Sequence, residues 1–437
     1  MNNCRKLKSV VFLLSLIAVL MCSSSIVFSS DIKPEVKAEW DRVETIVMQP
    51  PSIADFWISI FPKGNGYDTP FNYLAAKQEH LHYANILRAA GIKIYMVEDV
   101  LLEGTVDKDG NAIQGKKLND LQNFAKKYLK IKCNELDDSV KKELEIEKDK
   151  AIKSLPPHVL IDLILQNPVI TAEKDPNSIS DFDAKYSLHP LLDLFYLRDQ
   201  IITTPKGIVL GKFARAEVRH DESEVVKFAL NKLGIKPVYA VTGKGTLEGG
   251  DFFMADGIAF IGEGVRTNSE GIKQLMDNDV IGVRKVVVVK DHLLSPAQMH
   301  LDTYFNLPAP KVAVLSLERV KKVDGGVDDS KASTVDVYEL KNGSYIQTVK
   351  DRDFRDYLIH DLKYKIIPVS VKDQRALATN FLTIAPYTIV GPEGASQEFK
   401  DALKKEGVEA TWVDMTNIKR GFGAARCVTQ PIQRRQD

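Results

Sequence analysis

The chain has 437 residues, with 59 basic and 59 acidic side chains and 44% hydrophobic residues. This balance is typical of a globular protein and argues against a fibrous or largely disordered chain. No basic stripe of the kind that binds nucleic acid stands out, so nucleic acid is not an expected partner. The length allows two or three domains of ordinary size, or one large α/β domain.

The first thirty residues differ from the rest of the chain. Three basic residues precede an uncharged apolar run from Ser9 to Met21, and several serines follow. This order predicts a secretory signal peptide over residues 1–30, and hence an exported protein, periplasmic or secreted. The run is shorter than the ~20 residues of a spanning helix, so no stable membrane span is expected. Cys22 leaves lipid attachment open as an alternative.

Cysteines are few. Cys4 and Cys22 fall in the predicted leader, which leaves Cys133 and Cys427. Two thiols so far apart do not make a disulfide framework, although export implies an oxidising compartment. Cys133 lies in a charged helical segment and is expected to be a spectator. Cys427 therefore needs a chemical explanation.

Apolar periodicity predicts strands and helices that alternate along the chain. The first elements are expected to be a strand at 43–49, a helix at 73–90 and a strand at 92–98. A charge-rich pattern at about 115–166, without strand signal, predicts a helical insertion. Further strands are expected at 207–213, 237–241, 258–263, 285–291, 311–317, 345–349, 365–371, 381–391 and 409–415, and helices at 222–233, after Asn268, at 351–362 and at 396–405. The alternation indicates an α/β architecture, and no glycine-rich nucleotide-binding loop accompanies it.

Four short clusters place acidic, His, Arg or Cys residues beside glycine or after apolar residues. They are FYLRD at 195–199, LEGGD at 247–251, MHLDT at 299–303 and GFGAARC at 421–427. Each alone fits a turn, a surface pair, a strand end or a buried small hydrophobe. Together they supply carboxylates, an imidazole and a thiol, which predicts one shared site.

This set of groups suits attack on a planar cation. A guanidinium carbon is a poor electrophile, so an enzyme must hold the cation with carboxylates, deliver a strong nucleophile and protonate the departing nitrogen. Carboxylates match the guanidinium by paired charge-assisted hydrogen bonds, and the bound cation favours the reactive thiolate. No CxxC or HExxH pattern is present, so a metal site is not expected.

In order along the chain, the motifs are FxRD, EGGD, a downstream RT, HLDT and a glycine-rich RC followed by proline. In this combination the sequence resembles the arginine deiminases of the guanidine-modifying superfamily. The resemblance implies one catalytic domain over residues 31–437, with the pentein fold: an α/β propeller of ββαβ modules. It also implies no cofactor and a helical insertion where 115–166 lies.

The resemblance implies a role for each matching residue. Cys427 would attack the guanidinium carbon, and His300 would act first as acid and then as base. Asp199 and Asp302 would hold the guanidinium nitrogens. Glu248 would pair with His300 and with the substrate.

Other residues are expected at the substrate's amino-acid end. Arg266, in GVRT, would bind the substrate carboxylate, and Arg219, in RHDE, fits a second such arginine after one inserted residue. The predicted substrate-binding set also includes Asp193, Arg198 and Asp251.

Three positions depart from the family pattern. Asp193 stands where the family usually has Asn, and its charge would repel an α-carboxylate unless it is protonated or paired. Phe422 replaces a residue that is polar in many members, and Ala424–Ala425 replaces residues that are more often Gly or Pro. These changes concern the substrate's amino-acid end rather than the groups that act on the guanidinium.

The leading hypothesis is hydrolysis of L-arginine to L-citrulline and ammonia through a Cys thiouronium intermediate. The same groups would also serve another guanidine, such as peptidyl-arginine or agmatine, or amidino transfer to an amine. A non-catalytic guanidine-binding protein is the alternative from a different class. A small molecule is the expected partner, and the oligomeric state, a homo-oligomer included, is left open.

Overall fold

The computed structural model describes residues 32–133, 136–180, 182–219 and 221–436. The predicted signal peptide and Cys22 lie outside these residues, so export and lipid attachment stay predictions. Within the described ranges, no helix combines the length and the apolar character that crossing a bilayer requires.

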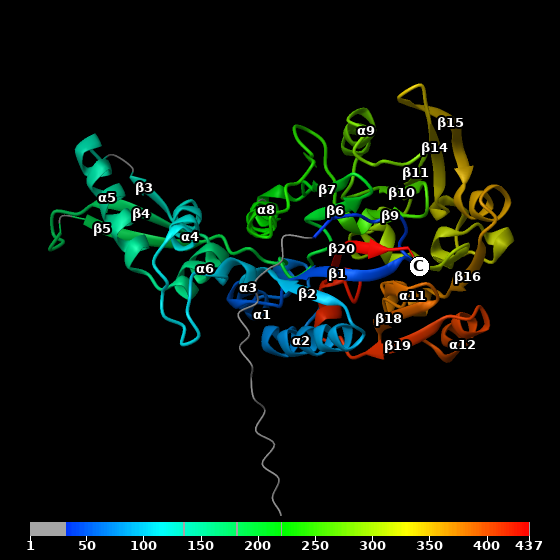
Figure 1. Ribbon diagram of the computed structural model, residues 1–437, viewed down its shortest axis with the longest axis horizontal. Coiled ribbons are helices and arrows are strands. Elements are labelled where there is room, and N and C mark those ends of the chain that lie inside the picture. Colours follow the sequence, from blue (N-terminus) through cyan, green and yellow to red (C-terminus); the bar gives the residue numbers. More distant parts are fainter. Residues whose placement is uncertain (1–31, 134–135, 181, 220, 437) are drawn as a thin grey trace, which may run out of the picture.

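Five groups of three strands repeat one pattern (Figure 1). The first strand of each group runs antiparallel to the second, and the second runs parallel to the third. In this strand order the five units are β6 (Ile201–Thr204), β7 (Gly207–Leu210) and β8 (Tyr239–Ala240); β9 (Phe252–Met254), β10 (Ile258–Glu263) and β11 (Lys285–Lys290); β12 (Phe305–Ala309), β13 (Val312–Ser316) and β16 (Lys365–Val369); β17 (Leu382–Ala385), β18 (Thr388–Pro392) and β19 (Glu409–Val413); and β20 (Gln430–Arg435), β1 (Arg42–Met48) and β2 (Lys93–Met96). The fold is therefore mixed α/β, which confirms the architecture expected from the alternating pattern.

The second and third strands of each unit are joined through helical segments, because parallel neighbours need a crossover connection. In chain order these helices are α1 (Phe56–Ile60), α2 (Tyr73–Ala89), α7 (Ala216–Arg219), α8 (Glu222–Lys232), α9 (Ser269–Asp277), α10 (Phe354–Asp356), which runs into a π-helical turn (Tyr357–Asp361), and α12 (Gln397–Lys405). A short helix, α11 (Val371–Arg375), follows β16. A hairpin of β14 (Thr334–Lys341) and β15 (Ser344–Asp353) extends the unit of β9, β10 and β11 to five strands.

Strand β11 shows why some strands do not alternate polar and apolar residues. Its residues Val286–Val289 are all buried. Val286 and Val288 belong to one hydrophobic cluster, and Val287 and Val289 belong to another. The sheet is thus covered on both faces here, which is the reason for an unbroken apolar run.

The two ends of the described chain meet in one sheet. Strand β20 pairs antiparallel with β1, with Gln430 opposite Val47. Cys427 lies three residues before β20. The N-terminal strand therefore fixes the segment that carries the predicted nucleophile.

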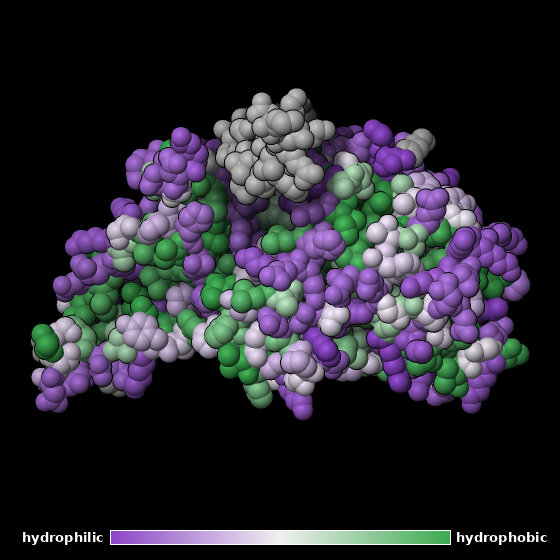
Figure 2. Space-filling view, turned by 90° about the horizontal axis from the view of Figure 1, so that it is seen from below, coloured by the Kyte–Doolittle hydropathy of each residue, from purple (hydrophilic) through white to green (hydrophobic). Residues whose placement is uncertain are grey.

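A lobe projects from the units between β2 and β6 (Figure 1). Helix α3 (Val97–Leu102) leads toward it, and its elements are α4 (Lys116–Lys126), β3 (Lys130–Cys133), α5 (Asp138–Ser154), α6 (Pro157–Gln166), β4 (Pro168–Lys174) and β5 (Phe182–Leu188). The expectation of helix without strand over 115–166 was wrong, because β3 lies inside this range and forms a sheet with β4 and β5. Figure 2 shows the molecule from below, and in this view hydrophobic residues lie among hydrophilic ones on the side of the lobe.

Candidate active site

Each of the five units begins its first strand just after a polar residue. Asp199 precedes β6, Asp251 precedes β9, Asp302 precedes β12, Asn380 precedes β17 and Cys427 precedes β20. Four of these residues come from the four sequence motifs. Asn380 has the equivalent place in the remaining unit, without a motif. The four motifs therefore occupy the same position in four of the five units, just before the first strand.

The two glycines of LEGGD are required by close packing. A Cβ atom at Gly249 would lie 2.0 Å from the carbonyl oxygen of Arg198, and one at Gly250 would lie 2.7 Å from the His300 ring. A larger residue at either position would push a neighbouring motif away. The glycines thus let three of the motifs pack against one another.

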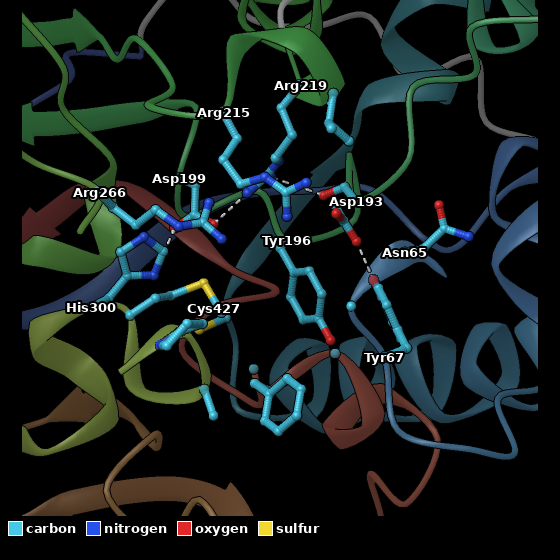
Figure 3. A pocket seen from close by; sticks show the side chains of 18 of the residues that line it. Asn65, Tyr67, Asp193, Tyr196, Asp199, Arg215, Arg219, Arg266, His300 and Cys427 are labelled. Atoms are coloured by element: carbon cyan, nitrogen blue, oxygen red, sulfur yellow. Dashed lines mark hydrogen bonds and ion pairs between the residues drawn. The ribbon is translucent and has the colours of Figure 1, made fainter. Parts of the chain in front are cut away.

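A cavity of about 290 Å³ lies where the motifs meet (Figure 3). In Figure 3, Cys427 and His300 lie on one side of the Tyr196 ring, and Asp193 and Tyr67 lie on the other. The predicted site residues that line the cavity are Cys427, His300, Asp199, Arg219, Arg266 and Asp193. Those that stand behind this lining are Glu248, Asp302, Asp251 and Arg198. The structure thus brings six of the ten predicted residues to one small-molecule-sized cavity.

Cys427 is buried, with two side chains at its sulfur. Asn380 donates from Nδ2 to Sγ at 3.1 Å, and Sγ lies 3.6 Å from Asp302 Oδ2. Asn380 Oδ1 also accepts from the backbone N–H groups of Cys427 and Ala424, at 3.2 and 3.0 Å. Burial, with the charges of Asp302 and Asp199, raises the pKa of the Cys427 thiol well above its ordinary value. The thiol therefore needs a nearby positive charge to ionise.

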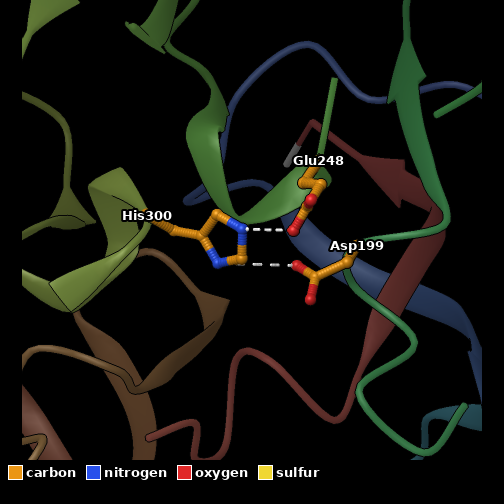
Figure 4. Close-up of side chains that lie close together, drawn as sticks. All are labelled: Asp199, Glu248 and His300. Atoms are coloured by element: carbon orange, nitrogen blue, oxygen red, sulfur yellow. Dashed lines mark hydrogen bonds and ion pairs between the residues drawn. The ribbon is translucent and has the colours of Figure 1, made fainter. Parts of the chain in front are cut away.

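His300 is paired with buried carboxylates (Figure 4). Its Nε2 lies 2.8 Å from Glu248 Oε2, and its Nδ1 lies 3.8 Å from Asp199 Oδ1. Burial alone would lower the pKa of His300, but Asp199, Glu248 and Asp251 outweigh burial and raise it to about 9. Burial would raise the pKa of Glu248, but His300 and Arg266, whose Nη1 is 3.2 Å away, lower it to about 2. At neutral pH the pair is therefore imidazolium and carboxylate.

Asp199, Glu248 and His300 also offer ligand atoms that lie within 4.8 Å of one another. Such a spacing would suit a metal ion. An imidazolium has no free lone pair, so a metal must first displace the proton that the raised pKa holds in place. The charges of this cluster therefore favour proton transfer over metal binding.

Arg219 is already paired with protein carboxylates. Its Nη1 donates to Asp199 Oδ2 at 2.9 Å, and its Nη2 donates to Glu222 Oε2 at 2.8 Å. The guanidinium also stacks on the Phe213 ring at 4.2 Å. Burial would lower the pKa of Arg219, but Glu222 and Asp199 raise it well above its ordinary value. Arg219 therefore orients Asp199. Its positive charge is already balanced by protein carboxylates, which weakens its attraction for a substrate carboxylate.

Asp302 is held by a buried ion pair. Arg426 donates from Nη1 to Asp302 Oδ2 at 2.9 Å and from Nε to Glu39 Oε1 at 3.0 Å. Asp302 and Arg426 are both fully buried. The other oxygen of Asp302, Oδ1, has no hydrogen-bond partner among the described residues.

Two predicted substrate-binding residues support the motifs from behind. Arg198 donates from its backbone N–H to the Cys427 carbonyl at 3.0 Å and from Nε to the Arg426 carbonyl at 3.3 Å. Asp251 Oδ1 accepts the backbone N–H of Leu301 at 2.8 Å, and burial raises the pKa of Asp251 to about 7. These contacts position Cys427 and the segment of His300 rather than a ligand.

Several residues at the site lie outside the four sequence motifs. They are Asn380 beside the thiol, and Asn65, Tyr67 and Arg215 on the cavity wall. Tyr196 lies inside FYLRD and lines the cavity, but it is not one of the predicted site residues. A signal for Asn380 exists in its place just before a strand, because the other four units have site residues there.

The arginine deiminase family model matches residues 66–434. The arginine deiminase of Halobacterium salinarum is 24% identical, over 92% of this chain and 97% of that protein. The arginine deiminase of Oenococcus oeni is 23% identical, over 84% of this chain and 88% of that protein.

Two solved structures share the fold. DDAH of Pseudomonas aeruginosa, complexed with citrulline, has a TM-score of 0.50 at 14% identity, over 89% of this chain and 99% of that one. The N-terminal domain of ArgZ, an arginine dihydrolase from cyanobacteria, has a TM-score of 0.52 at 13% identity, over 90% of this chain and 98% of that one. Both are mixed α/β proteins of the pentein fold.

Proposed function

Because the chain belongs to the arginine deiminase family, hydrolases that act on C–N bonds of the guanidino group, we propose that it converts L-arginine to L-citrulline and ammonia. One observation carries the proposal. Asp199 Oδ1 and Asp302 Oδ1 are buried without a hydrogen-bond partner among the described residues, and both carboxylates act on the Cys427 thiol. Buried acceptors are normally satisfied, and guanidinium N–H groups match carboxylates well. A guanidinium bound there would satisfy both oxygens beside the nucleophile.

The first half of the reaction would form a covalent adduct. The thiol of Cys427 releases its proton to solvent as the cation binds, because the guanidinium charge offsets the two carboxylates. Sγ then bonds to the guanidinium carbon. When this tetrahedral adduct collapses, the bond to a terminal nitrogen breaks, and the His300 imidazolium gives that nitrogen its proton. Ammonia leaves, and a thiouronium remains on Cys427.

The second half would hydrolyse the adduct. Neutral His300 takes a proton from water, and the water oxygen bonds to the thiouronium carbon. The C–S bond then breaks with the electron pair on sulfur. The hydroxyl of the adduct loses its proton as the ureido product forms, and Cys427 regains a proton. The Glu248–His300 pair supports this cycle, since Glu248 stabilises the imidazolium form.

We also infer that the five units surround this site as the modules of an α/β propeller. Two features support the inference. Each unit starts its first strand at a site residue, so five separate segments converge, and β20 joins β1 so that the last unit includes the first strand of the chain. Closure of this kind removes exposed sheet edges.

The experiment is an assay of the purified protein with L-arginine under reducing conditions, following citrulline and ammonia together. Equal amounts of both products are expected from the wild type and none from Cys427→Ala. Cys133→Ala is the matched control, because Cys133 is only partly buried and lies in the lobe. Full activity in Cys427→Ala, or its loss in Cys133→Ala alone, would contradict the proposed nucleophile.

A further inference from the structure

The end of the cavity away from the thiol carries an unneutralised carboxylate. Asp193 lies there beside Tyr67, whose hydroxyl donates to Asp193 Oδ1 (Figure 3). Asp193 is only partly buried and lines the cavity. Among the described residues, no ion pair joins the Asp193 carboxylate to a cation. The side-chain partner of Asp193 is thus a neutral hydroxyl.

The arginines that line the same cavity all have acidic partners. Arg219 is bonded to two buried carboxylates, and Arg266 is bonded to Glu248 at 3.2 Å. Arg215 has a long and exposed contact, from Nε to Glu217 at 3.4 Å. The arginines near Asp193 are therefore bonded to other carboxylates, whereas the Asp193 carboxylate has no ion pair of its own among the described residues. This imbalance favours a positive group of the ligand over a negative one.

The backbone holds Asp193 firmly in place. It has a left-handed φ of 71°, which Asp tolerates better than most residues. Its carbonyl accepts from the Tyr196 backbone N–H at 2.9 Å and from Arg219 Nη2 at 3.2 Å. Its own N–H donates to Asp55 Oδ1 at 3.4 Å. Strain of this kind at a cavity wall is typical of a functional position, and here it fixes where the carboxylate stands.

We infer that Asp193, with Tyr67, is a cation subsite that recognises the ammonium group of a guanidine substrate, so that the substrate carboxylate is dispensable. The inference rests on the proposed hydrolysis of a guanidinium at Cys427. It deepens that function by naming the substrate class, which is guanidines with a free primary amine at the far end. L-Arginine and agmatine belong to this class. N-acylated and peptidyl arginine do not, because acylation removes the charge.

A bound ammonium group would also offset the unfavourable burial of the Asp193 carboxylate. Burial raises the pKa of Asp193, which Arg219 and Tyr67 only partly offset. A cation at the carboxylate would stabilise its charged form. The resulting hydrogen bond joins two ions and is stronger than one between neutral groups. The departure from Asn at this position, which would disfavour a bare carboxylate ligand, thus becomes a means of selecting amines.

The test compares kcat/KM for four guanidines in the wild type and in Asp193→Asn. L-Arginine and agmatine carry the ammonium, whereas Nα-acetyl-L-arginine and 4-guanidinobutyrate do not. Agmatine is expected within about 10-fold of L-arginine, and the two compounds without ammonium about 10- to 100-fold lower, as the loss of one charged hydrogen bond implies. Asp193→Asn should remove most of this gap. A melting temperature of Asp193→Asn close to that of the wild type shows that the variant is folded.

The result that overturns the inference is a gap between compounds with and without ammonium that Asp193→Asn leaves intact, or agmatine turnover more than about 100-fold below L-arginine. If no compound is turned over, the proposed hydrolysis fails, and binding to Cys427→Ser decides about the subsite. Agmatine should then bind more tightly than 4-guanidinobutyrate, and Asp193→Asn in the same background should abolish the difference. Equal binding would refute the subsite as well.

Discussion

Beside the nucleophile, the side chain of Asn380 is both a hydrogen-bond donor and a hydrogen-bond acceptor. An ionised Asp of the same size could only accept. Its Nδ2 donates to Cys427 Sγ, which lowers the pKa of the thiol against the effect of burial, and its Oδ1 holds two backbone N–H groups. Asn380→Asp keeps the acceptor and the size but loses the donor. We expect kcat/KM to fall about 10- to 100-fold and the pH midpoint of alkylation by iodoacetamide to rise by about one unit.

A matched control exists for this variant. Asn306 is also fully buried, and its Nδ2 donates to the carbonyls of Thr379 and Phe381, on either side of Asn380. Asn306→Ser should therefore lower Tm without moving the alkylation profile. An alkylation profile of Asn380→Asp that matches the wild type would show that Asn380 acts only on the loop and not on the thiol.

The sequence could locate much of the site at the scale of residues. The motifs stand out because acidic, His, Arg or Cys residues lie beside glycines or after apolar residues, and packing explains the glycines at Gly249 and Gly250. Asn380 could not be found in this way, since TNFL contains no acidic, His, Arg or Cys residue. Its place just before the expected strand at 381–391 was the one signal, and that signal has a meaning only once the other four units are known to carry site residues at the same position.

At the scale of elements, helices with apolar periodicity and strands with an unbroken apolar run were predictable, and several of the shortest strands were not. Helix α2 runs over Tyr73–Ala89, against the expected 73–90, and β10 has the expected range of 258–263. The strands β6, β9 and β12 were missed. They have three to five residues each and are fully buried, so they show no alternation of polar and apolar side chains.

The lobe gives a prediction at this scale, because its helices differ in burial. Ile164 of α6 is fully buried in the cluster that also contains Val226 of α8, whereas Ile146 of α5 is 50% exposed. Ile164→Ala should lower the free energy of unfolding by about 2–5 kcal/mol, through lost burial and the cavity left behind. Ile146→Ala should change it by less than about 0.5 kcal/mol. Urea unfolding measures both, and similar losses would mean that the lobe does not share the core of the units.

At the scale of the whole molecule, the site depends on contacts between segments far apart in sequence. Arg426, next to the nucleophile, joins Glu39 before β1 to Asp302 before β12. Sheet pairing of β20 with β1 adds a second link between the two ends. No local pattern indicates such pairings, which is why the sequence could predict single helices and strands better than the contacts between distant segments.

Removal of the Glu39 charge tests this link. Burial would raise the pKa of Glu39, but Arg426, Arg434 and Arg198 lower it from 4.5 to about 2. Ionised Glu39 therefore stabilises the fold above pH 4.5, and this contribution is lost as the pH falls toward 2. Glu39→Gln should reduce the free energy of unfolding by about 3 kcal/mol at pH 7, because it leaves buried arginine charge unpaired, with a smaller deficit below pH 4.5. Glu44→Gln breaks a solvent-accessible ion pair between Glu44 of β1 and Arg435 of β20. It should reduce the free energy of unfolding by less than about 1 kcal/mol. Equal losses for the two variants in urea unfolding would refute a special role for the buried link.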